Sequence, residues 1–200
     1  VNIDEKIDME QLKKSGGSVL AFVTTDNVKV GAKGAEYIIS KLADGGEVAI
    51  IEGKAGNASG ENRKQGATEA FKANSKFNLV ASQPADWDRS KALDLAANLI
   101  QKYPNLKAIY ACNDTMALGA VQAVANANKT GKIIVVGTDG APEARDSIKQ
   151  GKLSATVAQD PGMIGVTSLN ILLDAIKNKP AISPDVEAKE VPVESNLISQ

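Results

Sequence analysis

The sequence contains no histidine among its 200 residues, and this absence excludes several classes of site. Without an imidazole there is no Ser-His-Asp or Cys-His catalytic arrangement and no histidine metal site. The single cysteine, Cys112, cannot form an internal disulfide. It lies in the apolar run AIYAC, which is typical of a buried and inert thiol. We therefore expect no catalytic residues, no metal and no cofactor.

The sequence also lacks an excess of charge of one sign. Lys and Arg together number 23 and Asp and Glu 24, so the formal net charge is -1 and the pI is near 5.6. This balance lacks the electropositive surface typical of nucleic-acid-binding proteins, and we expect no nucleic-acid partner. No apolar run approaches the ~20 residues of a membrane span.

The first residues, Val1-Asn2-Ile3-Asp4, have neither an initiator methionine nor the charged and apolar regions of a signal peptide. They resemble the end of a strand that is already under way. We expect the first elements of the fold, and any signal segment, to precede Val1.

Short β-branched runs alternate with amphipathic segments along the chain. The runs EVAIIEG and KIIVVG are nearly continuous in apolar residues, as strands covered on both faces are. This alternation predicts an α/β fold with a parallel sheet sandwiched by helices. The expected strands are residues 19–25, 47–53, 77–83, 107–112, 132–137 and 153–159, and the expected helices are residues 27–43, 59–74, 88–102, 114–128, 141–150 and 161–178.

A glycine-rich loop, GKAGNASGENR, follows the apolar run EVAIIEG. It lacks the Lys-Ser or Lys-Thr pair of a P-loop, and its glycines do not have the G-x-G-x-x-G spacing of a dinucleotide site. Glycines that only allow a tight turn would explain the loop but not Arg63. This cation lies near a helix N-terminus, where the helix dipole disfavours it, so we expect another group to stabilise it.

Polar side chains follow the strands at their carboxyl ends, where open parallel sheets bind ligands. Carboxylates accept hydrogen bonds from the hydroxyl groups of a ligand, and the side chains of Arg, Asn and Gln donate hydrogen bonds to the hydroxyl oxygens. An indole can cover the C–H face of a pyranose. This combination predicts a neutral ligand with several hydroxyl groups. The predicted site residues are Asp4, Arg63, Trp87, Asn113, Asp139 and Gln159.

Most of these residues also have a simpler interpretation. Asn113 is a suitable helix cap, and Asp139 with the following glycine is a common turn pair. Trp87 fits a partly buried core aromatic, and Arg63 alone fits a solvated surface charge. The prediction of a binding site therefore depends on the whole set lying at one edge of the sheet.

Two carboxylates, Asp86 and Asp88, flank Trp87 and raise the alternative of a glycosidase acid–base pair. A helix cap at the start of residues 88–102 accounts for one of them. The sequence places no further carboxylate opposite them, so it does not support hydrolysis.

Eight segments spread over nearly the full length of the chain match a known family: VNIDEKID, AFVTTDN, GGEVAIIEGKAGNASGE, ASQPADWDR, NDTMA, VVGTDG, PEAR and ATVAQ. In these segments the chain resembles the periplasmic sugar-binding proteins of the ribose/galactose type, which have the type I periplasmic-binding-protein fold. The resemblance implies non-catalytic binding of a monosaccharide, D-allose or a related hexose, by the same six residues. It also implies a periplasmic location, or a lipid-anchored one outside a Gram-positive cell, and a membrane ABC permease as partner. The effector-binding core of LacI-type regulators is the alternative.

The resemblance further implies two lobes joined by three crossings. The expected C-terminal sugar-binding lobe comprises residues 26–159 and 189–200. A remnant of the N-terminal lobe would comprise residues 1–25 and 160–188. The helix at 161–178 has an apolar face made to cover further strands, and we expect a missing N-terminal segment or a second copy to cover it. The residues of this face are Met163, Ile164, Val166, Leu169, Leu172 and Leu173.

Overall fold

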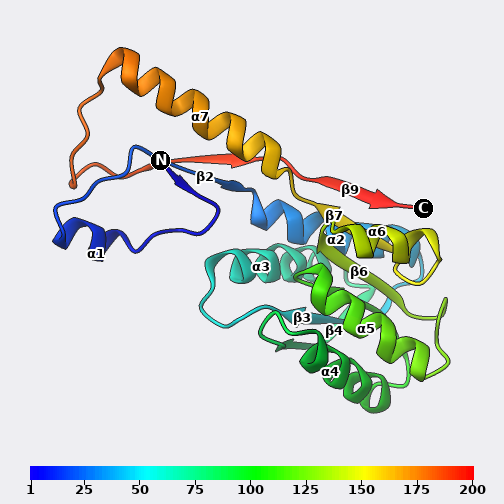
Figure 1. The fold of residues 1–200 in the computed structure, drawn as a ribbon. Coiled ribbons are helices and arrows are strands. Elements are labelled where there is room, and N and C mark those ends of the chain that lie inside the picture. Colours follow the sequence, from blue (N-terminus) through cyan, green and yellow to red (C-terminus); the bar gives the residue numbers. More distant parts are fainter. The chain divides into compact units, whose positions relative to one another are not determined.

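The computed structural model describes residues 1–200, which form two compact units (Figure 1). Unit 1 comprises Val1–Asp26 and Asp160–Ser195, and unit 2 comprises Asn27–Gln159 and Asn196–Gln200. The chain passes from one unit to the other after residues 26, 159 and 195. None of its helices has both the length and the hydropathy of a membrane span.

Unit 2 is built on a six-stranded sheet with the order β4-β3-β5-β6-β7-β9. All neighbouring pairs are parallel except β7 and β9, which are antiparallel. The carboxyl ends of the parallel strands therefore meet at one edge of the sheet. The strands are β3 (Gly46–Glu52), β4 (Phe77–Pro84), β5 (Leu106–Ala111), β6 (Ile134–Asp139), β7 (Ala155–Ala158) and β9 (Asn196–Ser199).

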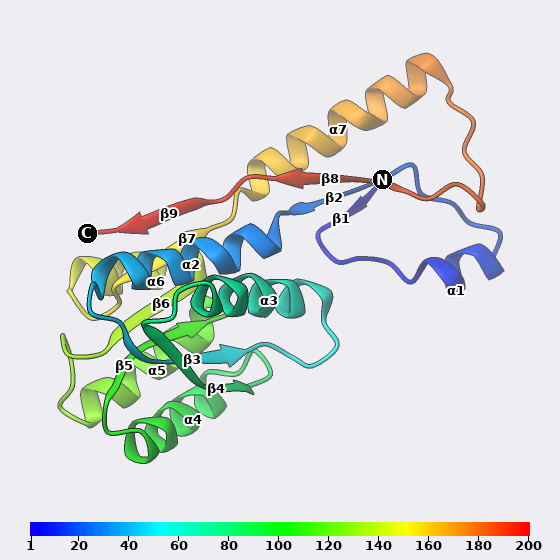
Figure 2. The ribbon, with the colours of Figure 1, turned by 180° about the vertical axis from the view of Figure 1, so that it is seen from behind.

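Helices cover both faces of this sheet, with α2 and α3 on one face and α4 and α5 on the other (Figures 1 and 2). The apolar runs of β3, β5 and β6 are buried between these layers, which confirms the predicted α/β architecture. The α6 helix contacts α5 and β7. The helices are α2 (Asn27–Lys41), α3 (Ala58–Lys72), α4 (Arg89–Lys102), α5 (Asp114–Asn126) and α6 (Pro142–Lys149).

Side-chain caps start the helices that follow β3, β4 and β5. Asn57, Asp88 and Asn113 each accept a hydrogen bond from a backbone N–H of the first helical turn. Pro142 occupies the start of α6, where its missing N–H costs nothing. These three caps therefore begin helices at the carboxyl edge of the sheet.

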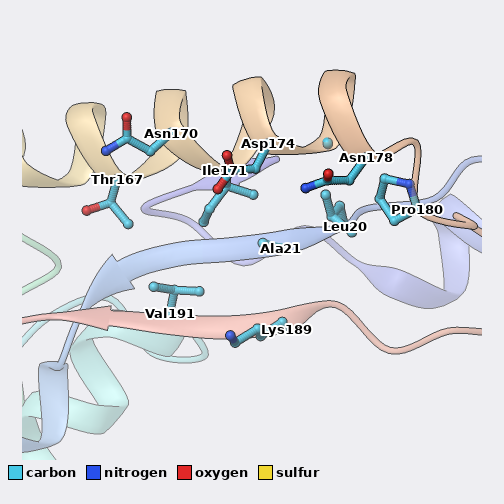
Figure 3. Close-up of a pocket in the computed structure, with 11 residues that line it drawn as sticks. Leu20, Ala21, Thr167, Asn170, Ile171, Asp174, Asn178, Pro180, Lys189 and Val191 are labelled. Atoms are coloured by element: carbon cyan, nitrogen blue, oxygen red, sulfur yellow. The ribbon is translucent and has the colours of Figure 1, made fainter.

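Unit 1 contains a three-stranded parallel sheet of β1 (Asn2–Ile3), β2 (Ala21–Thr25) and β8 (Lys189–Val193), in the order β1-β2-β8. The α7 helix (Pro161–Asn178) lies along this sheet (Figure 3), and α1 (Met9–Lys14) buries no side chain. The buried core of unit 1 is small. It consists of Val23, Ile164 and Val193, with Val1, Ile171 and Val191 packed around them.

The structure differs from the sequence prediction in the C-terminal tail. Residues 189–200 were expected in the larger unit, but β8 pairs with β2 from Ala21–Lys189 to Thr25–Val193. Only Asn196–Gln200 belongs to unit 2, and Asp26 belongs to unit 1. A short edge strand such as KEVPV has a pattern that fits either sheet, so its sequence does not select the partner.

One residue of the expected apolar face of α7 also differs. Ile164 is buried against the sheet of unit 1. The other five predicted residues, together with Ile176, have exposed fractions between 43% and 70%. The prediction of an uncovered apolar face is therefore confirmed for most of its members.

Candidate functional site

Arg63 is a buried cation in the second turn of α3, with 7% of its side chain exposed. Its Nε donates to Asn27 Oδ1 at 2.8 Å, and its Nη1 donates to the Cys112 carbonyl oxygen at 2.8 Å. Nη1 also lies 3.4 Å from Asp139 Oδ1. A carboxylate and two neutral oxygens replace water around the guanidinium, which accounts for a cation near a helix N-terminus. The remaining nitrogen, Nη2, can donate to a ligand.

Asp139 ends β6 and lies at the centre of this cluster. Its Oδ1 accepts a hydrogen bond from Gln159 Nε2 at 2.7 Å in addition to the contact with Arg63. Burial raises the pKa of Asp139, while Arg63 and Gln159 act in the opposite direction by stabilising the ionised form. Because 34% of the side chain is exposed, the carboxylate can still accept a hydrogen bond from a ligand hydroxyl.

Trp87 is half-buried in the loop between β4 and α4. Two consecutive residues of this loop, Asp86 and Trp87, have positive φ angles of 54° and 65°. The indole lies against Gly53 and Gly60, where an added Cβ would come within 2.2 and 2.9 Å of ring carbons. The glycine-rich loop therefore forms a surface on which the indole packs, and two of its glycines are required by that contact.

Asn113 follows Cys112, whose carbonyl binds Arg63, and it starts α5. Its Oδ1 accepts a hydrogen bond from the Met116 N–H at 2.8 Å, so its role as a helix cap is confirmed. The cap uses only the oxygen of the carboxamide. The Nδ2 group can still donate to a ligand, so capping and binding are compatible at this residue.

The alternative catalytic groups have structural roles. Asp88 accepts the Lys91 N–H at 2.8 Å as the cap of α4, and Asp86 pairs with Lys91 Nζ at 2.7 Å. Cys112 is buried, and burial raises the pKa of its thiol to about 12. A thiol that remains protonated in this way is a poor nucleophile, as the sequence predicted.

Asp4 belongs to unit 1 and follows β1. Its φ angle is 65°, and its exposed side chain extends from a backbone fixed against β2. The Asp4 N–H donates to the Val23 carbonyl at 2.9 Å, and the Asp4 carbonyl accepts from Thr24 Oγ1 at 3.1 Å.

Five of the six predicted residues lie in unit 2. Hydrogen bonds join Arg63, Asp139 and Gln159 directly. Asn113 adjoins Cys112, and Trp87 lies over Gly60 at the start of α3, so both flank this cluster. Sequence reasoning treated Asn27 only as a helix start and missed it as a partner of Arg63. It also missed two buried polar residues, Thr156 and Asp114, which hydrogen-bond to each other. A signal for Asp114 was present: it follows a buried strand, and the helix that it begins already has Asn113 as its cap.

The chain matches the periplasmic binding protein domain family over residues 7–180. It is 64% identical over 201 residues to the D-allose-binding periplasmic protein of Escherichia coli K12, and the match covers 100% of this chain and 65% of that protein. It is 40% identical over 187 residues to the ribose import binding protein of Haemophilus influenzae, covering 92% of this chain and 60% of that relative. The chain therefore spans only part of the length of these curated relatives.

Solved structures give the same result. A periplasmic solute binding protein from Actinobacillus succinogenes with bound D-allose has a TM-score of 0.85 and 34% identity, covering 98% of this chain and 66% of that one. The Caulobacter myo-inositol binding protein, bound to myo-inositol, has a TM-score of 0.82 and 31% identity, with coverage of 98% and 64%. The parallel sheet with polar groups at its carboxyl edge and these matches lead to one conclusion: the chain belongs to the periplasmic binding protein domain family.

Proposed function

We propose that the whole protein binds a monosaccharide outside the cytoplasm, without converting it, and delivers it to a membrane ABC permease. The observation that carries this proposal is the cluster of Arg63, Asp139 and Gln159 at the carboxyl edge of the sheet. A partly exposed carboxylate held by two donors suits a neutral polyol, because each hydroxyl can donate to the carboxylate and accept from the guanidinium or the carboxamide.

D-allose is the first ligand to test, and a related hexose is the alternative. The E. coli relative is a D-allose-binding protein, and the Actinobacillus structure holds D-allose. The Haemophilus relative is a ribose import protein, which makes D-ribose the informative comparison. Trp87 supports a ring-shaped ligand, since an indole packs against the C–H groups of one face of a pyranose.

We assign the sugar contacts of unit 2 to Arg63, Trp87, Asn113, Asp139 and Gln159. Asp4, in unit 1, stays a prediction from the sequence. Replacement of Asp4 by Asn in the whole protein checks it. A weaker sugar affinity supports the assignment, and an unchanged affinity removes Asp4 from the set.

We further propose that the chain preceding Val1 in the whole protein covers unit 1. Six large apolar side chains of α7 are exposed, and a cavity of about 480 Å³ lies between α7, β2 and β8 (Figure 3). At about 25 cal/mol per Å² of apolar surface, leaving this face in water forfeits several kcal/mol. The greater length of the relatives supports a covering segment of the same chain over a second copy.

The proposed function is tested by calorimetric titration of the whole protein with D-allose and with D-ribose. The wild-type protein is expected to bind one of them saturably. Asp139→Asn is expected to weaken this binding about ten- to a hundredfold, because the ligand and Arg63 both lose a charged hydrogen-bond partner. Asp146→Asn is the matched control, since Asp146 is exposed on α6 and pairs only with Lys149.

An equal sugar affinity for the Asp139→Asn variant would contradict the assignment of the site. Conversion of the bound sugar into a product would contradict the non-catalytic role. Binding of a sugar that is recovered unchanged, lost in Asp139→Asn and kept in Asp146→Asn, supports both the assignment of the site and the non-catalytic role.

A further inference from the structure

Asp114 is a buried carboxylate that the proposed sugar contacts do not use. It is the first residue of α5 and 1% exposed. An acidic residue in the first turn stabilises a helix through its dipole, but Asn113 already supplies the cap here. Both carboxylate oxygens of Asp114 bind groups outside the helix. Oδ1 accepts from Thr156 Oγ1 at 2.7 Å, and Oδ2 accepts from the Ala141 N–H at 2.8 Å.

These bonds hold the two residues that follow Asp139. The Gly140 N–H donates to Thr156 Oγ1 at 3.1 Å, and the Gly140 carbonyl accepts from Arg145 Nε at 2.8 Å. Together with the bond from Ala141 to Asp114, they bind the turn from three elements: α5, α6 and β7. The backbone immediately after Asp139 is therefore fixed by three side chains, of which Asp114 and Thr156 are buried.

The conformation of Asp139 requires such support. Its φ angle is 123°, a strained region that residues with a side chain rarely adopt. The following residue is Gly140, with a φ of 75°, and its α-carbon lies so close to Ala158 that an added Cβ would come within 2.5 Å. A turn of this kind persists only where its surroundings determine it.

The Asp114 carboxylate also fits a space that the sequence keeps open. A Cβ at Gly137, on the neighbouring strand β6, would come within 2.3 Å of Asp114 Oδ1. Burial and the nearby Asp139 raise the pKa of Asp114 to about 6, against the hydrogen bonds that favour its ionised form. Burial thus disfavours the charged form of Asp114. The hydrogen bonds that its carboxylate accepts from Thr156 and Ala141 explain why an acidic residue is nevertheless found at this position.

We propose that Asp114 and Thr156 form a positioning clamp that holds Asp139 in its binding conformation. The inference rests on the proposed function, in which Asp139 binds the sugar. Without the clamp, the turn relaxes from its strained φ angle, and the Asp139 carboxylate leaves the geometry set by Arg63 and Gln159. Asp114 and Thr156 are not among the proposed sugar contacts, and their side chains hold the turn through the backbone N–H groups of Gly140 and Ala141.

Thr156→Val and Thr156→Ser test the clamp in the whole protein. Valine keeps the shape of threonine but removes the hydroxyl that bridges Asp114 and Gly140, whereas serine keeps this hydroxyl. Val124→Ala is a control for lost stability, because Val124 is buried farther along α5 and contributes to the hydrophobic core. Two quantities are measured: the sugar affinity, and the hydrogen-exchange rates of the Gly140 and Ala141 amides without sugar.

Thr156→Val is expected to lower the affinity about tenfold or more and to accelerate exchange at Gly140 and Ala141 by at least about tenfold. Thr156→Ser and Val124→Ala should stay close to the wild type in affinity. The clamp is overturned if Thr156→Val retains wild-type affinity and exchange, or if serine fails to rescue what valine removes. Failure of the wild-type protein to bind sugar would refute the proposed function, while the exchange rates would still test the clamp.

Discussion

The titration of a single residue, Asp114, can be detected in the pH dependence of the protein's folding stability. Its pKa is raised from 3.8 to about 6, so between these values the folded protein holds a proton that the unfolded chain has released. Folding stability must then decrease as the pH rises through this window and level off above about pH 6. The total change from Asp114 is of order 3 kcal/mol.

Unfolding by urea, measured at several pH values for the wild-type protein and Asp114→Asn, checks this prediction. Asp139 also has a raised pKa and shifts stability in the same direction. It is present in both proteins, but its charge repels that of Asp114, so the comparison reports Asp114 together with its coupling to Asp139. The free energy of unfolding of the wild-type protein should fall relative to the variant between about pH 4 and pH 6. A difference that stays constant over this range would refute the raised pKa.

At the residue scale, the sequence predicted which residues lie close together more successfully than it predicted the hydrogen bonds between them. The helix dipole indicated that Arg63 needs a stabilising group, and Asp139 was among the predicted residues. The bonds from Arg63 to Asn27 and to the Cys112 carbonyl were not predictable. They depend on how close α2, α3 and β5 approach one another, which no local pattern encodes.

At the scale of helices and strands, the close packing of α2 against α3 matters most for the site. An added Cβ at Gly31 would come within 1.9 Å of the Arg63 carbonyl oxygen, and one at Gly66 within 1.9 Å of the Val28 carbonyl. The two helices therefore pack backbone against backbone, and glycine is required on each. This contact holds the part of α3 that carries Arg63.

Gly31→Ala is expected to separate the helices, lower stability by about 1–3 kcal/mol and weaken sugar binding, because Arg63 moves with α3. Gly165→Ala in the 200-residue chain is the control for stability. It adds the same methyl group in a helix where nothing of this chain lies within 4 Å, and it should raise stability by up to about 1 kcal/mol. Thermal unfolding of both variants of the 200-residue chain, and sugar titration of the Gly31→Ala variant of the whole protein, provide the measurement. Equal stability and affinity in the Gly31→Ala variant would contradict the close packing of α2 and α3.

How well a helix or strand could be predicted from the sequence depends on how much of it is buried. The strands of unit 2 that are covered on both faces, such as β3, have continuous apolar runs and were predictable from the sequence. The α1 helix was not, because it buries no side chain and so has no apolar period. The short β8 strand was assigned to the wrong unit, because register and partner depend on the sheet that receives it.

At the scale of the whole molecule, the most consequential feature is the uncovered apolar face of α7. Five apolar side chains at helical spacing, from Met163 to Leu173, were identified from the sequence and are exposed in the structure. An apolar surface of this kind is typical of an interface or of an incomplete fold. The identity of the covering segment was not predictable, since the surface fits any apolar partner.

The chain alone is expected to associate with itself and to bind a hydrophobic dye. Replacement of Leu169 and Leu173 by Lys should reduce both effects, because it places charges on the exposed face without touching the buried Ile164. Sedimentation and dye fluorescence measure them. A compact monomer of 20.8 kDa that binds no dye would contradict the account of an uncovered face.

The central claim is that the carboxyl edge of unit 2 binds a sugar, and the single tryptophan of the chain allows the most direct test. The indole N–H of Trp87 gives one NMR signal, which can be followed while D-allose is added to the 200-residue chain. If this edge binds a sugar, weak but saturable shifts are expected for this signal and for the Asn113, Asp139 and Gln159 amides, and they should be absent in Asp139→Asn. No shift at high sugar concentration, or shifts confined to other residues, would contradict it.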